Sequence, residues 1–155
     1  MKFTKPVELI VQGATAKPED SKAFEELKKA YSDYNNITFW HKNLLGIEWE
    51  KALLGVDVII MPYAAERYRY HWSAMLFTAI GFYKPVLISP EINPEVLEKF
   101  SIGARIQLNN TELFSSQLEQ FVSNFADNIE LYRKDLELAN EEFSHARLIK
   151  NILQK

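Results

Sequence analysis

The stretch Val56-Asp57-Val58-Ile59-Ile60-Met61 decides the fold class, because every position except Asp57 is apolar. A strand with apolar side chains on both faces is buried on both faces, and this is typical of a parallel sheet covered by helices. Gly55 and Pro62 bound the stretch, as turn residues bound a strand. The stretch therefore predicts a central strand of an α/β domain.

Strands and helices alternate on both sides of this stretch. Apolar and β-branched patterns predict the other strands at residues 7–12, 37–40, 85–89 and 105–108. Three- and four-residue spacings predict helices at residues 17–34, 47–54, 73–83, 93–100 and 111–125. Right-handed crossovers between parallel strands then predict a three-layer, Rossmann-like domain with helices on both faces of a five-stranded sheet in the order 2-1-3-4-5. We expect residues 1–155 to form this one domain.

A long amphipathic helix is predicted over residues 128–153. Its apolar positions recur every three or four residues and form one continuous stripe. At 1.5 Å per residue its length is about 40 Å, which is more than a small domain needs to cover its own sheet. The stripe predicts docking on a partner domain or on another copy of the chain, and coverage of the domain's own core is the alternative.

Composition excludes several classes of protein. The 155 residues include no cysteine, which excludes disulfides, cysteine nucleophiles, thiolate zinc sites and iron–sulfur clusters. The net charge of −3 argues against binding of a nucleic-acid backbone. No run approaches the ~18 to 20 apolar residues that span a bilayer, and the N-terminus lacks the apolar core of a secretory signal. We expect a cytoplasmic protein that meets a membrane at most peripherally.

The segment 63–72, between the third strand and the next helix, has the strongest functional signals. Ligands of parallel α/β sheets bind at the carboxyl ends of the strands, where this segment begins. It contains Arg67, Arg69 and four aromatic residues, and Ser73 is the expected N-cap of the following helix. Free backbone N–H groups at a helix N-terminus form an anion site, and a neighbouring arginine can grip a phosphate. The alternative is solvated arginines beside packed aromatics.

Three segments together resemble the donor-binding half of GT-B glycosyltransferases of the family 4 type. They are Gly55-Val56-Asp57-Val58-Ile59-Ile60-Met61-Pro62-Tyr63, the helix at 73–80, and Lys84-Pro85-Val86-Leu87-Ile88-Ser89. The family has a strand ending in Pro-Ser or Pro-Tyr, a loop, a helix, and then Lys-Pro-Val-Ile-Ala-Ser. Weaker matches follow in the family's order at residues 9–13, 36–39, 94–96, 101–106 and 111–113. The resemblance therefore covers most of the chain.

The resemblance implies a glycosyltransferase domain that binds a nucleoside-diphosphate sugar. Transfer would be to a glycan or lipid-linked acceptor in polysaccharide or surface-glycan biosynthesis. It implies no metal and no cofactor, because stabilising the charge on the leaving diphosphate is the main catalytic effect. An acceptor-binding domain or second subunit is also implied, with the helix at 128–153 as its docking element. No catalytic residue is assigned.

The resemblance also implies roles for particular residues. The helix start at Ser73, Ala74 and Met75 would face the diphosphate. The loop at His41 and Lys42 would flank the base. The complete set of expected donor-binding residues is Gly13, His41, Lys42, Tyr63, Arg67, Arg69, Ser73, Ala74, Met75 and Thr78.

The sequence departs from the family at several positions. The family's two glutamates, eight positions apart, fall on Tyr70 and Thr78, and its glycine before Lys-Pro-Val is Tyr83. The alternative function is a non-catalytic Rossmann-like binding or protein-interaction domain with a decayed donor site. Arg67 and Arg69 beside a helix start favour the enzyme, and the missing glutamates favour the alternative.

Three related nucleotide- or phosphate-binding classes lack their motifs here. A response-regulator receiver needs an aspartate at the end of the third strand, where this chain has Ile60-Met61. A dinucleotide-binding dehydrogenase needs Gly-x-Gly-x-x-Gly after the first strand, and Gly13-Ala14-Thr15 does not match it. The same segment is too poor in hydroxyls for a flavodoxin-type phosphate loop. A histidine general base, His41 or His71, is the remaining catalytic alternative.

Overall fold

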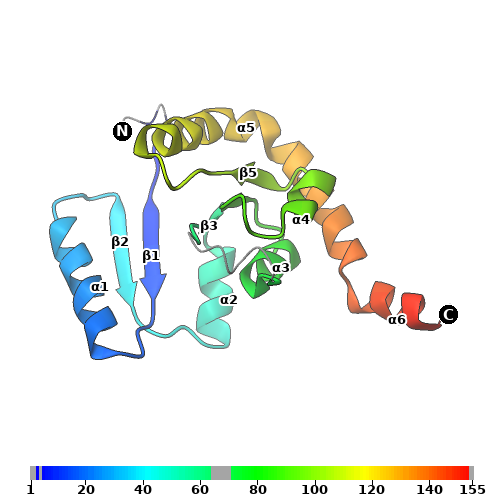
Figure 1. The fold of residues 1–155 in the computed structure, drawn as a ribbon, viewed down its shortest axis with the longest axis horizontal. Coiled ribbons are helices and arrows are strands. Elements are labelled where there is room, and N and C mark those ends of the chain that lie inside the picture. The colour runs from blue at the N-terminus through cyan, green and yellow to red at the C-terminus, as the bar shows by residue number, and fades with distance from the viewer. Residues whose placement is uncertain (1–2, 4, 64–70, 154–155) are drawn as a thin grey trace. The chain divides into compact units, whose positions relative to one another are not determined.

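The computed structural model describes residues 3, 5–63 and 71–153, and they form an α/β structure of parallel strands and helices (Figure 1). The chain divides into two compact units. Unit 1 comprises residues 1–4 and 52–155, and unit 2 comprises residues 5–51. Each unit has its own parallel sheet, with β1 and β2 in unit 2 and β3, β4 and β5 in unit 1.

Unit 2 is a strand–helix–strand unit followed by the start of another helix. Its elements are β1 (Leu9–Gly13), α1 (Pro18–Ala30), β2 (Ile37–His41) and the first residues of α2 (Ile47–Leu54). The two strands pair in parallel, with Gly13 opposite His41 at their carboxyl ends. Pro18 starts α1 with a preset φ and no N–H to satisfy. The Phe24 ring on α1 meets Phe39 of β2 edge to face at 6.0 Å, so α1 packs on this sheet.

Unit 1 contains the larger part of the core. Its elements after α2 are β3 (Ile59–Met61), α3 (Ala74–Gly81), β4 (Val86–Ile88), α4 (Pro94–Lys99), β5 (Gly103–Arg105), α5 (Thr111–Glu142) and α6 (His145–Leu153). The strand β4 is central and pairs in parallel with both neighbours, so that Val86 lies opposite Ile59 and opposite Gly103. All three residues of β4 are buried, as its apolar sequence predicts.

The α5 helix covers this sheet through an aromatic cluster. Leu87 of β4 and Ile106 pack with Phe121 and Tyr132 of α5 in one buried cluster. The Phe121 and Tyr132 rings stack at a centroid distance of 6.0 Å, although about three helical turns separate them. Figure 1 shows the reason, because α5 changes direction within its length. Between the two aromatic residues, the side-chain amide of Asn128 donates to the Asn124 carbonyl at 3.0 Å.

Three polar contacts tie α5 to the segment that precedes it. The backbone N–H of Gln107 donates to Gln117 at 2.8 Å. The N–H of Ser101 donates to the Asp135 carboxylate at 2.6 Å. Lys99 pairs with Glu142 at 2.9 Å. Residues later in α5 contact residues earlier in the preceding segment. The helix α5 therefore runs back along β5 toward α4.

The strand pairings confirm the class of the fold but not the full sheet order. The pairing of β2 with β1 and the order β3-β4-β5 agree with the predicted order. Within residues 3, 5–63 and 71–153 no ladder joins β1 to β3, so a single five-stranded sheet is not confirmed. The fifth strand occupies Gly103–Arg105 rather than the predicted 105–108. The reason is Gly103, where a Cβ would lie 1.9 Å from the Val86 carbonyl oxygen, so only glycine allows the pairing to begin there.

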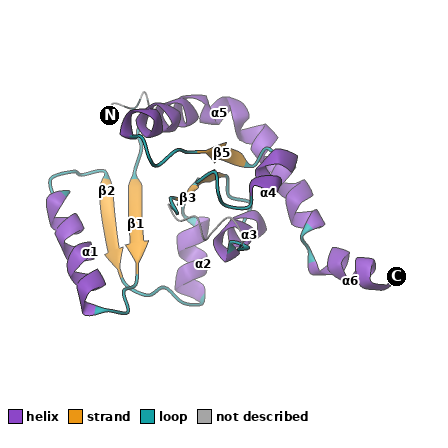
Figure 2. Cartoon of the chain, viewed as in Figure 1, coloured by secondary structure: helices purple, strands orange, loops and turns teal. Residues whose placement is uncertain are grey.

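The prediction of a helix break near residues 126–127 and of a continuous helix over 128–153 was wrong. No glycine or proline interrupts this region, so α5 continues to Glu142. Its N-cap is Asn110, whose side-chain oxygen accepts from the Leu113 N–H at 2.9 Å. The break lies at Phe143 and Ser144, seen as a short loop before α6 in Figure 2. The Ser144 hydroxyl accepts from Arg147 N–H at 3.1 Å and so caps α6.

Candidate functional site

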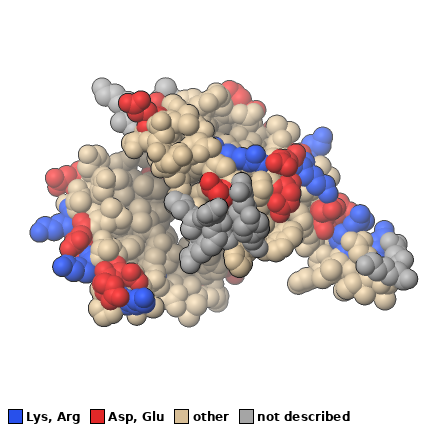
Figure 3. All heavy atoms as spheres, in the orientation of Figure 1, with Lys and Arg blue, Asp and Glu red and all other residues tan. Residues whose placement is uncertain are grey.

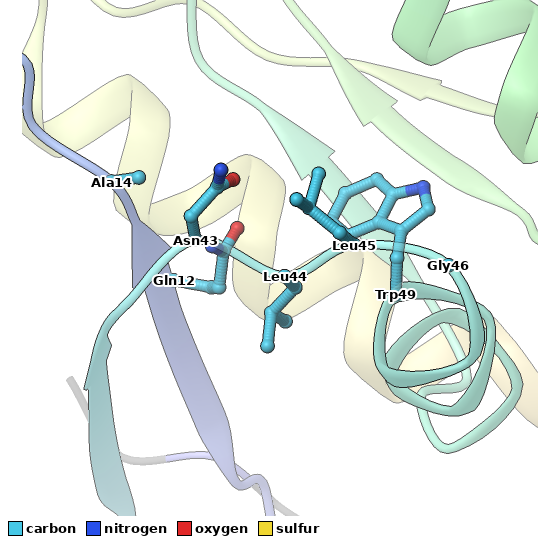
Figure 4. Close-up of a pocket in the computed structure, with 7 residues that line it drawn as sticks. All are labelled: Gln12, Ala14, Asn43, Leu44, Leu45, Gly46 and Trp49. Atoms are coloured by element: carbon cyan, nitrogen blue, oxygen red, sulfur yellow. The ribbon is translucent and has the colours of Figure 1, made fainter.

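A surface hollow lies at the carboxyl ends of β1 and β2, which is the edge where a ligand is expected. It has a volume of about 400 Å³. Its lining residues come from the end of β1, the loop after β2 and the first turn of α2 (Figure 4); they are Gln12, Ala14, Asn43, Leu44, Leu45, Gly46 and Trp49. All of them belong to unit 2.

The hollow has a polar end and an aromatic end. Gln12 and Asn43 lie side by side at one end, and Leu45 lies beside the Trp49 indole at the other (Figure 4). The Gln12 amide nitrogen donates to the Lys42 carbonyl at 2.8 Å, which fixes the amide and leaves its oxygen as an acceptor. Two carboxamides beside an indole face suit a flat, polar ring, because the ring can stack on the indole while the amides bond its edge.

Gly46 shapes the loop that forms the floor of the hollow. Its φ of +53° lies in the left-handed region, and a Cβ there would meet no atom within 4 Å. The backbone conformation, rather than space, therefore requires glycine. Immediately afterwards α2 begins and places Trp49 over the hollow. Lys42 lies on the same loop, and its ammonium pairs with Glu48 at 3.5 Å.

His41 lies at the same strand ends but is held by its own neighbours. Its Nδ1 lies 2.7 Å from the Glu25 carboxylate, and its Nε2 lies 2.9 Å from the Thr15 hydroxyl. The ring stacks on Phe24 at 4.4 Å, and Thr15 in turn bonds Ser21. A carboxylate can only accept, so Nδ1 bears the proton and Nε2 accepts from Thr15 in the neutral ring. This relay attaches the β1–α1 loop, which includes Ala14 of the hollow, to the end of β2.

The relay resembles the hydroxyl–histidine–carboxylate order of a nucleophilic site. However, the Thr15 hydroxyl of this relay also bonds the Ser21 hydroxyl, and α1, which supplies Ser21, has Glu19 and Asp20 in its first turn. Two carboxylates disfavour the negative charge that develops in acyl transfer. The geometry therefore favours a positioning role for His41.

In unit 1 the buried polar side chains gather at the carboxyl ends of β3 and β4. Ser73, Ser89 and Asn93 are the buried polar residues found within the described residues. The Ser73 N–H donates to the Asn93 side chain at 2.9 Å, and the Ser89 hydroxyl donates to the Met61 carbonyl at 3.3 Å. Asn93 adopts the left-handed conformation with φ of 39°, and its amide nitrogen also donates to Glu95. These bonds fix the start of α3.

The start of α3 has the form that the sequence predicts. The Ser73 hydroxyl accepts from Leu76 N–H at 3.2 Å, which confirms Ser73 as the N-cap. Ala74 and Met75 are the first two residues of α3, and backbone N–H groups at this place in a helix have no acceptor within the helix itself. Thr78 instead donates to the Ala74 carbonyl at 2.9 Å, so its proton is used inside the helix.

The expected site residues therefore fall into several groups. Gly13, His41 and Lys42 lie together at the strand ends of unit 2, and Gly13 is packed against the Phe24 ring. Tyr63 follows β3 and is half-buried. Ser73, Ala74, Met75 and Thr78 lie on the first turns of α3. Arg67 and Arg69 lie outside the described residues.

Gln12, Asn43, Trp49 and Asn93 were missed as site residues. Asn93 stands directly before Pro94 at a helix start, and this pattern could have identified it as a cap. Trp49 and Asn43 flank Gly46, the loop glycine that precedes a predicted helix. Gln12 follows the apolar run Leu9-Ile10-Val11 near the carboxyl end of β1, and a polar residue in that position is a sign of a site edge.

Two further features concern metal ligands and membrane-spanning helices. Across the part of the chain that is described, no three histidine, aspartate or glutamate side chains gather as metal ligands would. In the same part, no helix combines the length and hydrophobicity that crossing a bilayer requires. No protein-family model and no curated protein matches this chain.

Proposed function

We propose that the chain is the donor-binding domain of a cytoplasmic glycosyltransferase and binds a nucleoside-diphosphate sugar in polysaccharide or surface-glycan assembly. The enzyme would be hexosyltransferase-like. The chain supplies groups for the donor, and an acceptor-binding domain or second subunit supplies the rest. We therefore expect binding without appreciable transfer by the chain alone.

The hollow of unit 2 is the observation that supports the proposal most. It lies at the strand edge where Rossmann-like domains bind nucleotides. Trp49 offers a stacking face, and Gln12 and Asn43 offer both hydrogen-bond donors and acceptors. A nucleobase has this combination of a flat face and a polar edge, so we assign the base to the hollow.

Considered by itself, the start of α3 in unit 1 has the features of an anion site. The N–H groups of Ala74 and Met75 and the positive end of the helix favour a diphosphate. Stabilising the charge on this leaving group is how such a domain accelerates transfer, and it needs no metal. Arg67 and Arg69 are proposed to add charge-assisted bonds to the same phosphates.

The alternative is a non-catalytic binding domain, and one observation favours it. The family's second glutamate position is Thr78, whose hydroxyl donates to its own helix rather than outward. Under this alternative the fold is kept for a partner and the donor site no longer binds its nucleotide.

Calorimetric titration of the full chain with UDP, GDP, ADP, CMP and their sugar conjugates tests the proposal. We expect saturable binding of one nucleotide, weakened about tenfold or more by Trp49→Ala because a stacking partner is lost. Trp49→Phe should keep most of the affinity. Tyr34→Ala, an exposed aromatic of unit 2 that does not line the hollow, should change nothing.

A second set of variants tests the phosphate assignment. Arg67→Ala and Arg69→Ala should weaken binding of the diphosphate and leave binding of the bare nucleoside unchanged. A chain that is folded by circular dichroism yet binds no member of the panel contradicts the proposal and supports the alternative. If Trp49→Ala leaves the affinity for the nucleotide unchanged, the assignment of the base to the hollow is wrong.

A further inference from the structure

The α6 helix, His145–Leu153, exposes an apolar face. Leu148, Ile149 and Ile152 follow the three- and four-residue spacing that places side chains on one face of a helix, and Leu153 extends it. These four side chains are between 56% and 78% exposed. None of the nine residues of α6 is buried.

The charge of α6 is of one sign. Arg147 and Lys150 are its charged residues, His145 starts it, and the sequence adds Lys155 shortly after its end. The helix has no acidic residue, although the chain as a whole has a net charge of −3. Figure 3 shows Lys and Arg atoms beside uncharged surface at this end of the chain. A cationic helix with an apolar face is suited to an anionic surface.

Exposed aromatic side chains lie where α6 begins. Phe143, the residue before the Ser144 cap, is 37% exposed, and its ring is T-shaped to the Trp72 ring at a centroid distance of 6.5 Å. Trp72 is 66% exposed and packs on Phe77 at 5.0 Å. Tryptophan is favoured at the boundary between water and lipid, because its indole has an apolar body and a polar N–H.

We propose that α6 docks on the surface of an anionic lipid bilayer, with Leu148, Ile149, Ile152 and Leu153 inserted at the level of the headgroups. Arg147 and Lys150 lie near the lipid phosphates. Charge complementarity favours this occupant over a second copy of the chain. Pairing two α6 helices would bring their positive charges together, and the charges would repel each other. The inference is independent of nucleotide binding and goes beyond the proposed function.

The small size of α6 determines the kind of binding. Nine residues bury little apolar surface, and two or three cations attract lipid only within about one Debye length. Each contribution alone is weak, so docking needs both and is reversible. Binding should therefore decrease as salt is raised.

Vesicle flotation of the full chain tests the proposal. One set of vesicles contains phosphatidylcholine alone, and the other contains phosphatidylcholine mixed with phosphatidylglycerol. We expect flotation with the mixed vesicles only. The double variant Ile149→Asp/Ile152→Asp and the double variant Arg147→Glu/Lys150→Glu should each lower the partition coefficient about tenfold or more.

The matched control is Leu131→Asp/Leu138→Asp, which places the same charges on exposed leucines of α5. This variant should float as the wild type does. Equal flotation of all variants would move the contact away from α6 and overturn the proposal. So would the absence of flotation, or a dimer in sedimentation velocity that Ile149→Asp/Ile152→Asp dissociates, because the occupant would then be a second copy.

Discussion

Asn93 joins the starts of two helices with one side chain. Its Oδ1 accepts from the N–H of Ser73 at the start of α3, and its own backbone precedes Pro94 at the start of α4. A left-handed conformation at this point is tolerated by asparagine better than by most residues. The position therefore combines two separate demands, for a buried acceptor and for a positive φ.

Two variants of Asn93 separate these demands. Asn93→Ala should lower the free energy of unfolding by about 2 kcal/mol, because Ser73 N–H loses its acceptor and alanine is strained at positive φ. Asn93→Gly relieves the strain but not the lost bond, so its loss should be about half as large. Urea unfolding measures both. Equal losses would show that the backbone conformation contributes little.

Gly103 and Gly81 should respond in opposite ways to a methyl group. Gly103→Ala places a Cβ 1.9 Å from the Val86 carbonyl and should cost at least about 3 kcal/mol of stability, or prevent folding of unit 1. Gly81→Ala meets no atom within 4 Å and lies in α3, so it should be neutral or stabilise by up to about 1 kcal/mol. Thermal unfolding compares them, and a stable Gly103→Ala would contradict the pairing of β4 with β5.

At the scale of elements, α5 shows what sequence periodicity can and cannot predict. The apolar spacing predicted helix on both sides of residues 126–127, and both parts are helical. Apolar spacing does not distinguish a bend in a helix from a break between two helices, and here the helix continues through residues 126–127. The break between α5 and α6 has a local sequence signal, the helix cap Ser144. A pattern of apolar spacing does not include this signal.

The apolar pattern located β3 and β4 but predicted their burial only in part. All three residues of β4 are buried, whereas the middle residue of β3, Ile60, is 37% exposed, so the prediction that this strand is buried on both faces was wrong. The start of β5 depends on Gly103 and on a close approach to Val86, which a pattern of hydrophobicity does not contain. For the same reason the hollow was missed, since Gln12 and Trp49 are brought together by backbone geometry.

Tyr132 links the packing of α5 to pH. Burial raises the pKa of its phenol above the ordinary value of 10.0, because the phenolate is poorly solvated there. The unfolded chain therefore releases this proton first, and stability that is intact below pH 10 falls as the pH rises toward the folded pKa. The slope is at most about 1.4 kcal/mol per pH unit.

Urea unfolding across the alkaline range should detect this loss, and Tyr132→Phe should remove it. Tyr34→Phe, which alters an exposed tyrosine, is the control and should leave the slope unchanged. A wild-type slope equal to that of Tyr132→Phe would show that the phenol is solvated in the folded protein.

At the scale of the whole molecule, the two units differ in how much they bury. Among the described residues, the buried apolar side chains belong to unit 1 with the exception of Leu44. In unit 2 the helix α1 has no buried residue, and β1 and β2 are at most half-buried. Unit 2 therefore has less hydrophobic stabilisation for each residue that it orders.

Hydrogen exchange should show this difference directly. We expect backbone amides of β1 and β2 to exchange at least about tenfold faster than those of β4, because local opening of unit 2 costs less free energy. A nucleotide bound in the hollow should slow exchange in unit 2. Equal protection of the two sheets in the free chain would contradict the expectation.

The nested contacts of α5 imply an order of folding events. Gln107 and Gln117 are separated by 10 positions, Ser101 and Asp135 by 34, and Lys99 and Glu142 by 43. The entropy lost on closing a loop grows with its length, so the innermost pair forms most readily and shortens the loop that the next pair must close. The helix α5 would thus pack on β5 and α4 progressively, from its N-terminal turns toward its C-terminal end. The segment leading into α6 would become native last, after the rest of unit 1 has already formed.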